Sequence, residues 1–392
     1  MRNRFVLIGV ALLAVSAIPG REAWAQVATC GGSVGPCGQI PSNNTGYGTT
    51  AAEFLLLAPS ARGSALGGSF AALATDVSAV YYNPAGLSQM DHAGAMVSEM
   101  NYVAATKYAW AAIAFPMSGG ARALGVSVAN FGFSNQPVYT VDDPTGSSGE
   151  QYSVSETAVG LTYSQQFSDR FSAGLTAKVI NDQLGRVSGT AIAVDFGTSF
   201  HAIMGGRPLR ASFVIQNLGS TLSHSGQALA TVVTRTPPNG NQDVPQEPAT
   251  ASLTAKSWPL PVIFRVGLAY DLFQTSAGRF SVLGEFTQPN NNAPGFNLGG
   301  EYGVSLGSSG FSVAGRASVT YWPDNNLSAP DSGSTSYAGF SSTVGGTSQY
   351  RMSAGGGVYY RPSSGFGVGV DYAYRNLGLL GGVNMLSVGF TW

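Results

Sequence analysis

The chain has 392 residues, of which only 10% are charged, with a net charge of −1 at pH 7. Soluble domains average about 25% charged residues, so a soluble protein of this composition would be hard to keep in solution. The near-neutral charge also excludes nucleic-acid binding, which requires a basic surface. A membrane β-barrel fits, because it needs few charges and no continuous apolar run.

Residues 1–25 have the pattern of a secretory signal peptide. Arg2 and Arg4 precede an apolar run over residues 5–18, and the triplet 23–25 (Ala-Trp-Ala) forms a small-residue cleavage site. The run is shorter than the roughly 18 residues of a membrane-spanning helix. After residue 26 the sequence contains no apolar run of that length. We therefore predict an exported mature protein.

The two cysteines, Cys30 and Cys37, lie in a segment rich in glycine, serine, asparagine and threonine. In an oxidising periplasm they favour a local disulfide, because two sulfurs alone cannot complete a zinc site. The histidines, His92, His201 and His224, lack metal-ligand spacing. We predict a disulfide between Cys30 and Cys37 and no metal site.

Residues 51–90 lack strand alternation. Alanine-rich stretches can form short helices here, Gly67-Gly68 interrupts them, and Asn83-Pro84 forces a turn because proline disfavours the helical conformation of the residue before it. The segment could form a small subdomain against the barrel end or a plug inside the lumen, and we favour the plug. The predicted parts are thus a signal peptide (1–25), an N-terminal segment with the plug (26–94) and a barrel (95–392).

After Met90, apolar residues alternate with small or polar ones in fourteen segments, most of them near the ~9–11 residues that a tilted strand needs to cross a bilayer. Alternation sends successive side chains to opposite faces of a strand. We predict an all-β membrane protein, a 14-stranded antiparallel barrel. Its strands are expected at 95–104, 107–115, 123–132, 154–166, 170–183, 188–203, 209–217, 259–271, 279–288, 295–304, 311–321, 351–360, 366–376 and 383–392.

A set of charged residues within these segments falls on the parity that faces away from lipid: Lys178, Asp195, Arg265, Glu285, Glu301, Arg316 and Asp371. Arg265, Glu285, Glu301 and Arg316 come from four successive segments and can form pairs of opposite charge across neighbouring strands. They could stabilise the wall and anchor the plug, or bind the head group of an amphipathic ligand, with Arg265, Arg316 or Lys178 facing a carboxylate. The candidates for the lumen and its ligand are Arg62, Asp76, Lys178, Arg265, Glu285, Glu301, Arg316 and Asp371.

The long connections, 133–153, 218–258 and 322–350, each follow an odd-numbered segment, whereas short turns follow even ones. Outer-membrane barrels have long outer loops and short periplasmic turns, which puts the plug and both termini on the periplasmic side. Aromatic residues near segment ends are expected at the membrane interfaces. They include Tyr108, Trp110, Tyr321, Trp322, Tyr359, Tyr360 and Trp392.

An enzyme is not expected. Residues 303–307 match G-x-S-x-G but run from a strand into a turn, without the helix that a nucleophile elbow needs. The sequence has no dinucleotide-binding or P-loop motif, so we predict no cofactor.

The string from Phe54 through Ala61-Arg62, Gly67-Gly68 and Asp76 ends in the turn motif Asn83, Pro84, Ala85, Gly86 and Leu87. It resembles the N-terminal signature of the PorV/PorQ family of outer-membrane proteins, relatives of the FadL/TodX-like outer-membrane transporter superfamily. The following barrel is similar in pattern and length. This class implies a monomer in the outer membrane of a Gram-negative bacterium, inserted by a barrel assembly machinery that reads the C-terminal Phe390 and Trp392.

The resemblance leaves three functions open. FadL-type proteins imply passage of an apolar or amphipathic compound past the plug or sideways through the wall, for which Gly355-Gly356-Gly357 is the candidate kink. The PorV/PorQ family implies instead an accessory of type IX secretion that binds exported cargo proteins at loops 218–258 and 322–350. A purely structural role is the third. Of the three, we favour transport.

Overall fold

The computed structural model describes residues 48–117, 121–234, 248–307, 309–322, 350–362 and 365–392. The predicted signal peptide and the predicted disulfide between Cys30 and Cys37 lie outside these residues and stay predictions. Within the described part of the chain, no helix is long and apolar enough to cross a membrane.

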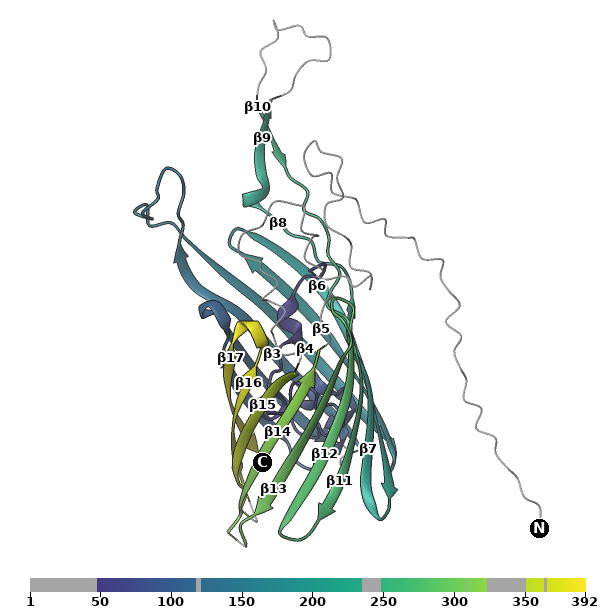
Figure 1. The fold of residues 1–392 in the computed structure, drawn as a ribbon. Helices are drawn as coiled ribbons and strands as arrows, with labels where there is room; N and C mark the ends of the chain where they lie inside the picture. Colours follow the sequence, from purple (N-terminus) through teal and green to yellow (C-terminus); the bar gives the residue numbers. More distant parts are fainter. Residues whose placement is uncertain (1–47, 118–120, 235–247, 308, 323–349, 363–364) are drawn as a thin grey trace, which may run out of the picture.

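Fourteen antiparallel strands close into a barrel (Figure 1). Neighbours along the chain pair with each other, and β1 pairs with β17 to close the ring. Each predicted segment corresponds to one strand, so the predicted 14-stranded barrel is confirmed. The strands are β1 (Gly94–Asn101), β2 (Lys107–Met117), β3 (Arg122–Pro137), β4 (Gln151–Ser168), β5 (Phe171–Leu184), β6 (Val187–Met204), β7 (Arg207–Gly219), β11 (Ile263–Gln274), β12 (Gly278–Pro289), β13 (Gly295–Ser305), β14 (Phe311–Tyr321), β15 (Tyr350–Tyr360), β16 (Gly367–Asn376) and β17 (Gly382–Thr391).

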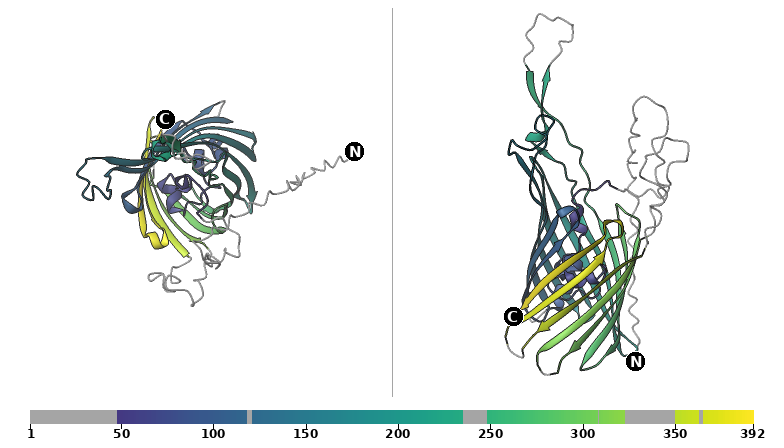
Figure 2. Two further views of the ribbon diagram at one scale, coloured as in Figure 1. Left: turned by 90° about the horizontal axis from the view of Figure 1, so that it is seen from above. Right: turned by 60° about the vertical axis from the view of Figure 1, so that its left-hand side comes forward.

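The connections from β3 to β4 and from β7 to β11 lie at one end of the barrel, the long-connection end, together with the tight turn from β5 to β6. The turns from β4 to β5 and from β6 to β7 lie at the other end, the short-turn end (Figure 2). The connection from β7 to β11 carries a hairpin of two strands, β9 and β10, that projects from the long-connection end (Figure 1). The small elements of the connections are η3 (Val103–Ala105), β8 (Ser225–Gly226), η5 (Gln227–Leu229), β9 (Ala230–Thr234), β10 (Pro248–Ser252) and η7 (Gly378–Leu380).

The barrel has a long wall, β3–β6, and a short wall, β11–β17. Strands β4 and β6 have 18 residues each, whereas β14 has 11 and β17 has 10. At about 3.3 Å per residue, the long strands exceed the short ones by roughly 20 Å or more. The long wall accordingly extends past the rest of the barrel at the long-connection end (Figures 1 and 2).

The outer surface of the long wall changes from apolar to polar within one row of side chains. Val128, Val159, Val179 and Ile192 are neighbours across the four strands and are 41%, 49%, 54% and 63% exposed. The next outward row toward the long-connection end is Asn130, Thr157, Asn181 and Thr190. An apolar belt on the outside is what a bilayer-spanning barrel requires, and here it ends between these two rows.

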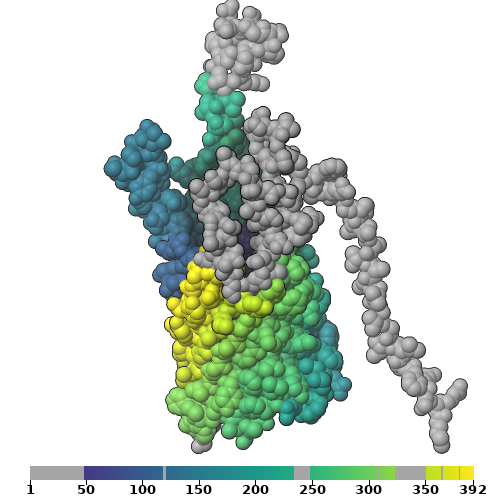
Figure 3. Space-filling model, in the orientation of Figure 1, coloured from purple at the N-terminus to yellow at the C-terminus, as the bar shows by residue number. Residues whose placement is uncertain are grey.

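The short wall forms an unbroken outer surface (Figure 3). Near its long-connection end, Phe264 of β11 lies between Phe213 of the adjoining strand β7 and Phe286 of β12, with ring centroids 4.8 and 6.5 Å apart. At the short-turn end, Phe390 stacks on Phe366 at 5.5 Å, and Trp392 is 47% exposed. Aromatic rings at both borders of an apolar belt are typical of membrane barrels.

The interface prediction is wrong for Tyr108, Trp110 and Tyr359, which face the lumen. Tyr108 and Trp110 are only 1% and 4% exposed, and the Tyr359 hydroxyl donates to Asp371 inside the barrel. In β2, alanines occupy both parities, so the sequence offers little contrast between its two faces. Residues 49–93, which lie inside the barrel, supply aromatic and apolar contacts that favour the inward orientation of Tyr108 and Trp110.

We call residues 49–93 the inner segment. It lies within the ring of strands (Figure 2) and contains η1 (Glu53–Leu56), α1 (Ala61–Ala65), α2 (Ala79–Tyr82) and η2 (Pro84–Gln89). At the long-connection end, Ala51 N donates to the Pro259 carbonyl (3.0 Å). At the short-turn end, Trp392 N donates to the Ala93 carbonyl (3.0 Å). The segment therefore crosses the whole lumen, whereas the loop-parity argument places it at the end that holds Trp392.

Candidate functional site

An ion network joins the inner segment to the short wall. The Arg62 guanidinium, on α1, binds both Glu301 carboxylate oxygens (2.8 Å each) and Asp76 (2.7 Å). Arg316 binds the same Glu301 and also Asp371, at 2.6 Å each. We call these five residues the short-wall ion network. The side chains of Arg316, Glu301 and Asp371 are buried, whereas those of Arg62 and Asp76 are 15% and 30% exposed. Two-pronged binding fixes the orientation of Arg62 as well as its distance.

The other predicted lumen charges also lie in ion pairs. Arg265 lies 3.4 Å from Glu285 and donates to the Gly68 carbonyl (2.7 Å), and Lys178 lies 2.7 Å from Asp195. Each cation considered as a partner for a ligand carboxylate, namely Arg265, Arg316 and Lys178, thus already faces a carboxylate of the protein. In this arrangement the charges anchor the inner segment and stabilise the wall.

The turn motif lies against the long wall through neutral hydrogen bonds. The Asn83 side chain, fully buried, donates to the carbonyls of Ala71 and Thr198 (3.1 Å each) and to Ser199 Oγ (3.0 Å). Its Oδ1 accepts from Ala85 N (3.1 Å), which satisfies a free donor at the start of η2. Polar wall residues complete the contact. Ser164 and Ser172 donate to the Ala85 carbonyl, and Ser164 Oγ accepts from Ser88 N.

Two wall glycines mark close approach of the inner segment. A Cβ at Gly174 would lie 2.4 Å from the Pro84 carbonyl carbon, and one at Gly355 would lie 2.7 Å from Ala65 Cβ. The glycine run in β15 therefore makes room for α1. The pairing of β15 with β14 and β16 continues through Gly355-Gly356-Gly357 without a register shift, so the structure shows no kink there.

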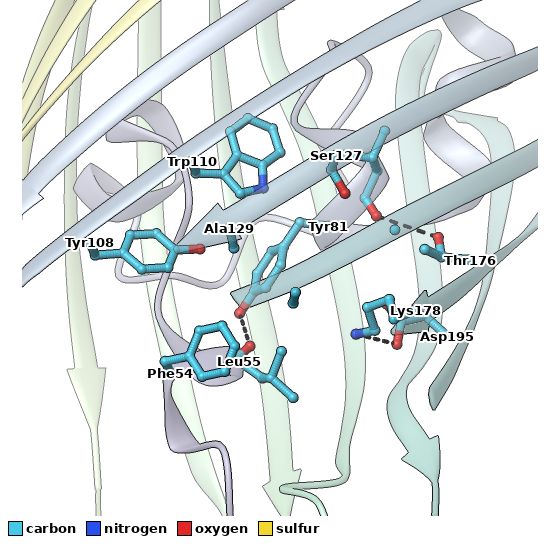
Figure 4. A pocket seen from close by; sticks show the side chains of 13 residues that line it. Phe54, Leu55, Tyr81, Tyr108, Trp110, Ser127, Ala129, Thr176, Lys178 and Asp195 are labelled. Atoms are coloured by element: carbon cyan, nitrogen blue, oxygen red, sulfur yellow. Dashed lines mark hydrogen bonds and ion pairs between the residues drawn. The ribbon is translucent and has the colours of Figure 1, made fainter. Parts of the chain in front are cut away.

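A cavity of about 30 Å³ lies between the inner segment and strands β2–β6 (Figure 4). Phe54 and Leu55 of η1 close it toward the long connections. Tyr81 borders it from α2, and the rings of Tyr108 and Trp110 border it from β2. Most of its lining is therefore aromatic or aliphatic, as in sites for apolar ligands.

Two hydrogen bonds hold Tyr81 in the lining. Its hydroxyl donates to the Leu55 carbonyl (3.0 Å), which links α2 to η1 across the cavity (Figure 4). Its own carbonyl accepts from the Gln216 side chain. Burial raises the pKa of the Tyr81 phenol, so the group stays a neutral donor.

The polar end of the cavity is built on a β-bulge. The pairing of β6 with β7 shifts between Val194 and Phe196, so Gln216 and Asn217 together oppose Asp195. Asn217 has a φ of 62°, and its backbone N–H donates to Asp195 Oδ1 (2.8 Å). The same Oδ1 binds Lys178 Nζ. The bulge thus orients the carboxylate and ammonium that line the cavity.

The charge pattern of the sequence predicts Lys178 as a lumen residue. It does not predict the apolar and aromatic lining of the cavity, which includes Phe54, Leu55, Tyr81, Tyr108 and Trp110. The parity of 107–115 offers no signal for Tyr108 and Trp110, because Lys107 falls on the opposite face and by itself would favour an aromatic face toward lipid. The G-x-S-x-G match is unremarkable, because Ser305 is the last residue of β13 and pairs with Ser312 of the next strand.

The cavity is too small for an organic ligand in this conformation. A cavity of about 150 Å³ binds benzene in other proteins, whereas this one holds about 30 Å³. Entry of an aromatic compound therefore requires η1 or α2 to move.

No family model matches the sequence, and no curated protein matches it. Among solved structures, the CymD monoaromatic hydrocarbon channel superposes with a TM-score of 0.52 at 10% identity, over 86% of this chain and 97% of that chain. The toluene transporter TodX of Pseudomonas putida gives a TM-score of 0.47 at 12% identity, over 86% of this chain and 98% of that chain. A FadL homologue of Pseudomonas aeruginosa gives 0.47 at 9% identity, over 85% of this chain and 98% of its own.

The fold therefore defines the class: this is a 14-stranded antiparallel β-barrel that superposes on the CymD channel. At 10% identity, the CymD likeness is evidence for this shared fold only.

Proposed function

We propose that the protein spans the outer membrane of a Gram-negative bacterium and admits small apolar compounds through its lumen. The observation that carries the proposal is the aromatic cavity enclosed between the inner segment and the wall. The apolar belt and the fold shared with a hydrocarbon channel support it. The short turns and Trp392 then face the periplasm, as the loop asymmetry of such barrels indicates.

We expect the inner segment to open at η1. Three neutral hydrogen bonds hold this end: Ala51 N to Pro259 O, Asn291 Nδ2 to Thr50 Oγ1, and Tyr81 Oη to Leu55 O, at 3.0 Å each. Each contributes about 0.5–1.5 kcal/mol. Asn291 Nδ2 also donates to the Glu53 carboxylate (2.5 Å), but Glu53 lies in no ion pair among the described residues. Breaking the short-wall ion network costs more, since a buried charge that loses its partner costs about 3–5 kcal/mol. Opening at η1 leaves that network intact.

Uptake by whole cells tests this function. A Gram-negative host without such a channel is given radiolabelled p-xylene, and expression of the protein should raise the initial uptake rate. Ala158→Leu fills the cavity and should abolish the increase, whereas Ala177→Leu, on the lipid face of β5, should retain it. Uptake equal to that of cells with an empty vector, with the barrel correctly inserted, would contradict the proposal.

A second candidate is the export role implied by the PorV/PorQ resemblance. The part of the long wall beyond the apolar belt and the β9–β10 hairpin favour it, because both present hydrogen-bonding surface outside the membrane (Figure 1). Secretion of cargo proteins by the native organism should then stop when the gene is deleted and return with the intact chain. If the organism has no type IX secretion components, this candidate is eliminated.

A further inference from the structure

We infer that the lumen cavity selects neutral aromatic compounds that carry one hydrogen-bond donor, of the phenol class, and that Asp195 Oδ2 receives the donor. The inference rests on the proposed function and adds a ligand class to it. A hydrocarbon without a polar group would then be a weaker ligand of the same site.

The first support is an unused acceptor. Asp195 is 1% exposed and lines the cavity. Its Oδ1 binds Lys178 Nζ (2.7 Å) and accepts from Asn217 N (2.8 Å), but its Oδ2 has no donor among the described residues. A buried polar atom normally has a hydrogen-bond partner, and one left without costs free energy. A donor brought by a ligand would remove that cost.

The second support is the charge of the site. A carboxylate ligand that approached Lys178 would also meet Asp195, which lies 2.7 Å from the ammonium. An amine ligand that approached Asp195 would meet Lys178 in the same way. Because a buried, already balanced pair disfavours an added charge of either sign, the site suits a neutral group. A phenol hydroxyl, with a pKa near 10, is neutral at pH 7 and donates one hydrogen bond.

The third support is the shape of the apolar part. Tyr81, Tyr108 and Trp110 present rings around the cavity, opposite the end that holds Lys178 and Asp195 (Figure 4). Aromatic rings favour edge-to-face or offset contacts with another ring. A planar ring with a single hydroxyl matches an aromatic enclosure with one polar end, and a long alkyl chain does not.

Three ligands of similar size and shape test the inference by calorimetric titration of the full-length protein in detergent. They are p-cresol, p-xylene and p-toluate, which differ in one substituent: hydroxyl, methyl or carboxylate. We expect p-cresol to bind about tenfold more tightly than p-xylene, equivalent to about 1.4 kcal/mol, and p-toluate to bind most weakly. Equal affinity for p-cresol and p-xylene, or preference for p-toluate, would overturn the inference and leave the proposed function intact. If none of the three binds, the proposed function fails as well.

Variants of Asp195 test whether its carboxylate causes the preference for p-cresol over p-xylene. Asp195→Asn retains the shape but loses the negative acceptor, and we expect the preference for p-cresol to fall to about threefold or less. The double variant Lys178→Met/Asp195→Leu should remove the preference and retain p-xylene binding, because apolar residues often replace a buried ion pair without loss of stability. Migration on unheated gels reports whether each barrel is folded. An unchanged p-cresol preference in the folded double variant would show that Asp195 is not the acceptor.

Discussion

The two walls of the barrel hold the inner segment by different means. The short wall binds α1 through charge, because Arg62 and Arg316 share Glu301, and it adds neutral hydrogen bonds such as Ser318 Oγ to the Ala65 carbonyl and a close approach at Gly355. The long wall binds η2 through neutral hydrogen bonds to Asn83 and through glycine-lined close contact. A charged contact is strong but depends on each partner, whereas a close-packed contact is distributed over many atoms. The difference suggests a fixed anchor along both walls and a movable end at η1, where hydrogen bonds and the buried Phe54 and Leu55 hold the chain without an ion pair among the described residues.

Deletion of residues 53–90 should have the largest effect, because it removes both contacts at once. The lumen would be left open, so uptake of an apolar dye and of small polar solutes by whole cells should rise, and discrimination between them should be lost. Deletion of 141–147 in the connection from β3 to β4 is the control and should leave uptake unchanged. Unchanged selectivity after the first deletion would show that the inner segment does not gate the lumen.

Glu301→Gln should break the contact to the short wall. It leaves Arg62 and Arg316 without their shared carboxylate, and we expect destabilisation by about 3–5 kcal/mol. The midpoint of thermal unfolding, followed by gel migration, measures this. Glu99→Gln is the matched control, since its pair with Lys107 is exposed and 3.6 Å long and should contribute less than about 1 kcal/mol. Equal effects of the two variants would refute the anchoring role.

Leu161→Arg tests where the long wall leaves the membrane. Leu161 lies on the apolar belt of β4 and is 58% exposed, and a charge there should cost about 2–4 kcal/mol at mid-membrane depth. Thr157→Arg, on the same face but in the polar row, should cost less than about 1 kcal/mol. Unfolding in lipid vesicles measures both. A similar cost at both positions would mean that the belt continues past the polar row.

Gly174→Ala should weaken the contact to the long wall. Its Cβ would lie 2.4 Å from the Pro84 backbone, so η2 must shift, at a cost of about 1–3 kcal/mol. Gly303→Ala, on β13, has nothing within 4 Å of its added Cβ and serves as the control. Protease sensitivity of residues 49–93 in the intact barrel should increase in the first variant only. No increase would argue that the close approach is not needed.

Tyr81→Phe should have the smallest effect and the most specific one. It removes the hydrogen bond to the Leu55 carbonyl, worth about 1 kcal/mol, and so favours movement of η1. We expect the p-xylene uptake rate to rise about fivefold with little change in unfolding. Tyr139→Phe, at an exposed position of the connection from β3 to β4, is the control. A slower uptake in Tyr81→Phe would place the hydroxyl in ligand binding rather than in closure.

The inner segment shows how far the sequence predicts this molecule. Its short helices and the Asn83-Pro84 turn follow from residue types and local spacing. Its path from one end of the lumen to the other does not, because hydrogen bonds such as that from Ala51 N to Pro259 O join residues that are far apart in the chain. Loop parity orients strands, but it carries no information on a segment that pairs with none of them.

The candidate site was predicted in part. Lys178 could be found because a charge on the inward parity of a strand is conspicuous. Tyr108 and Trp110 could not, since alanines on both faces of β2 leave its orientation open until the inner segment is in place.

The sequence by itself determined the barrel: the alternation of apolar and polar residues, the number of strands, and the ends at which long and short connections lie. These are local properties, since each strand must show one face to lipid and the other to the lumen. The course of the inner segment, the bulge that orients Asp195 and the aromatic cavity beside it depend on tertiary contacts. Those features arise where closure of the barrel brings distant residues within contact distance, and no local pattern encodes that proximity.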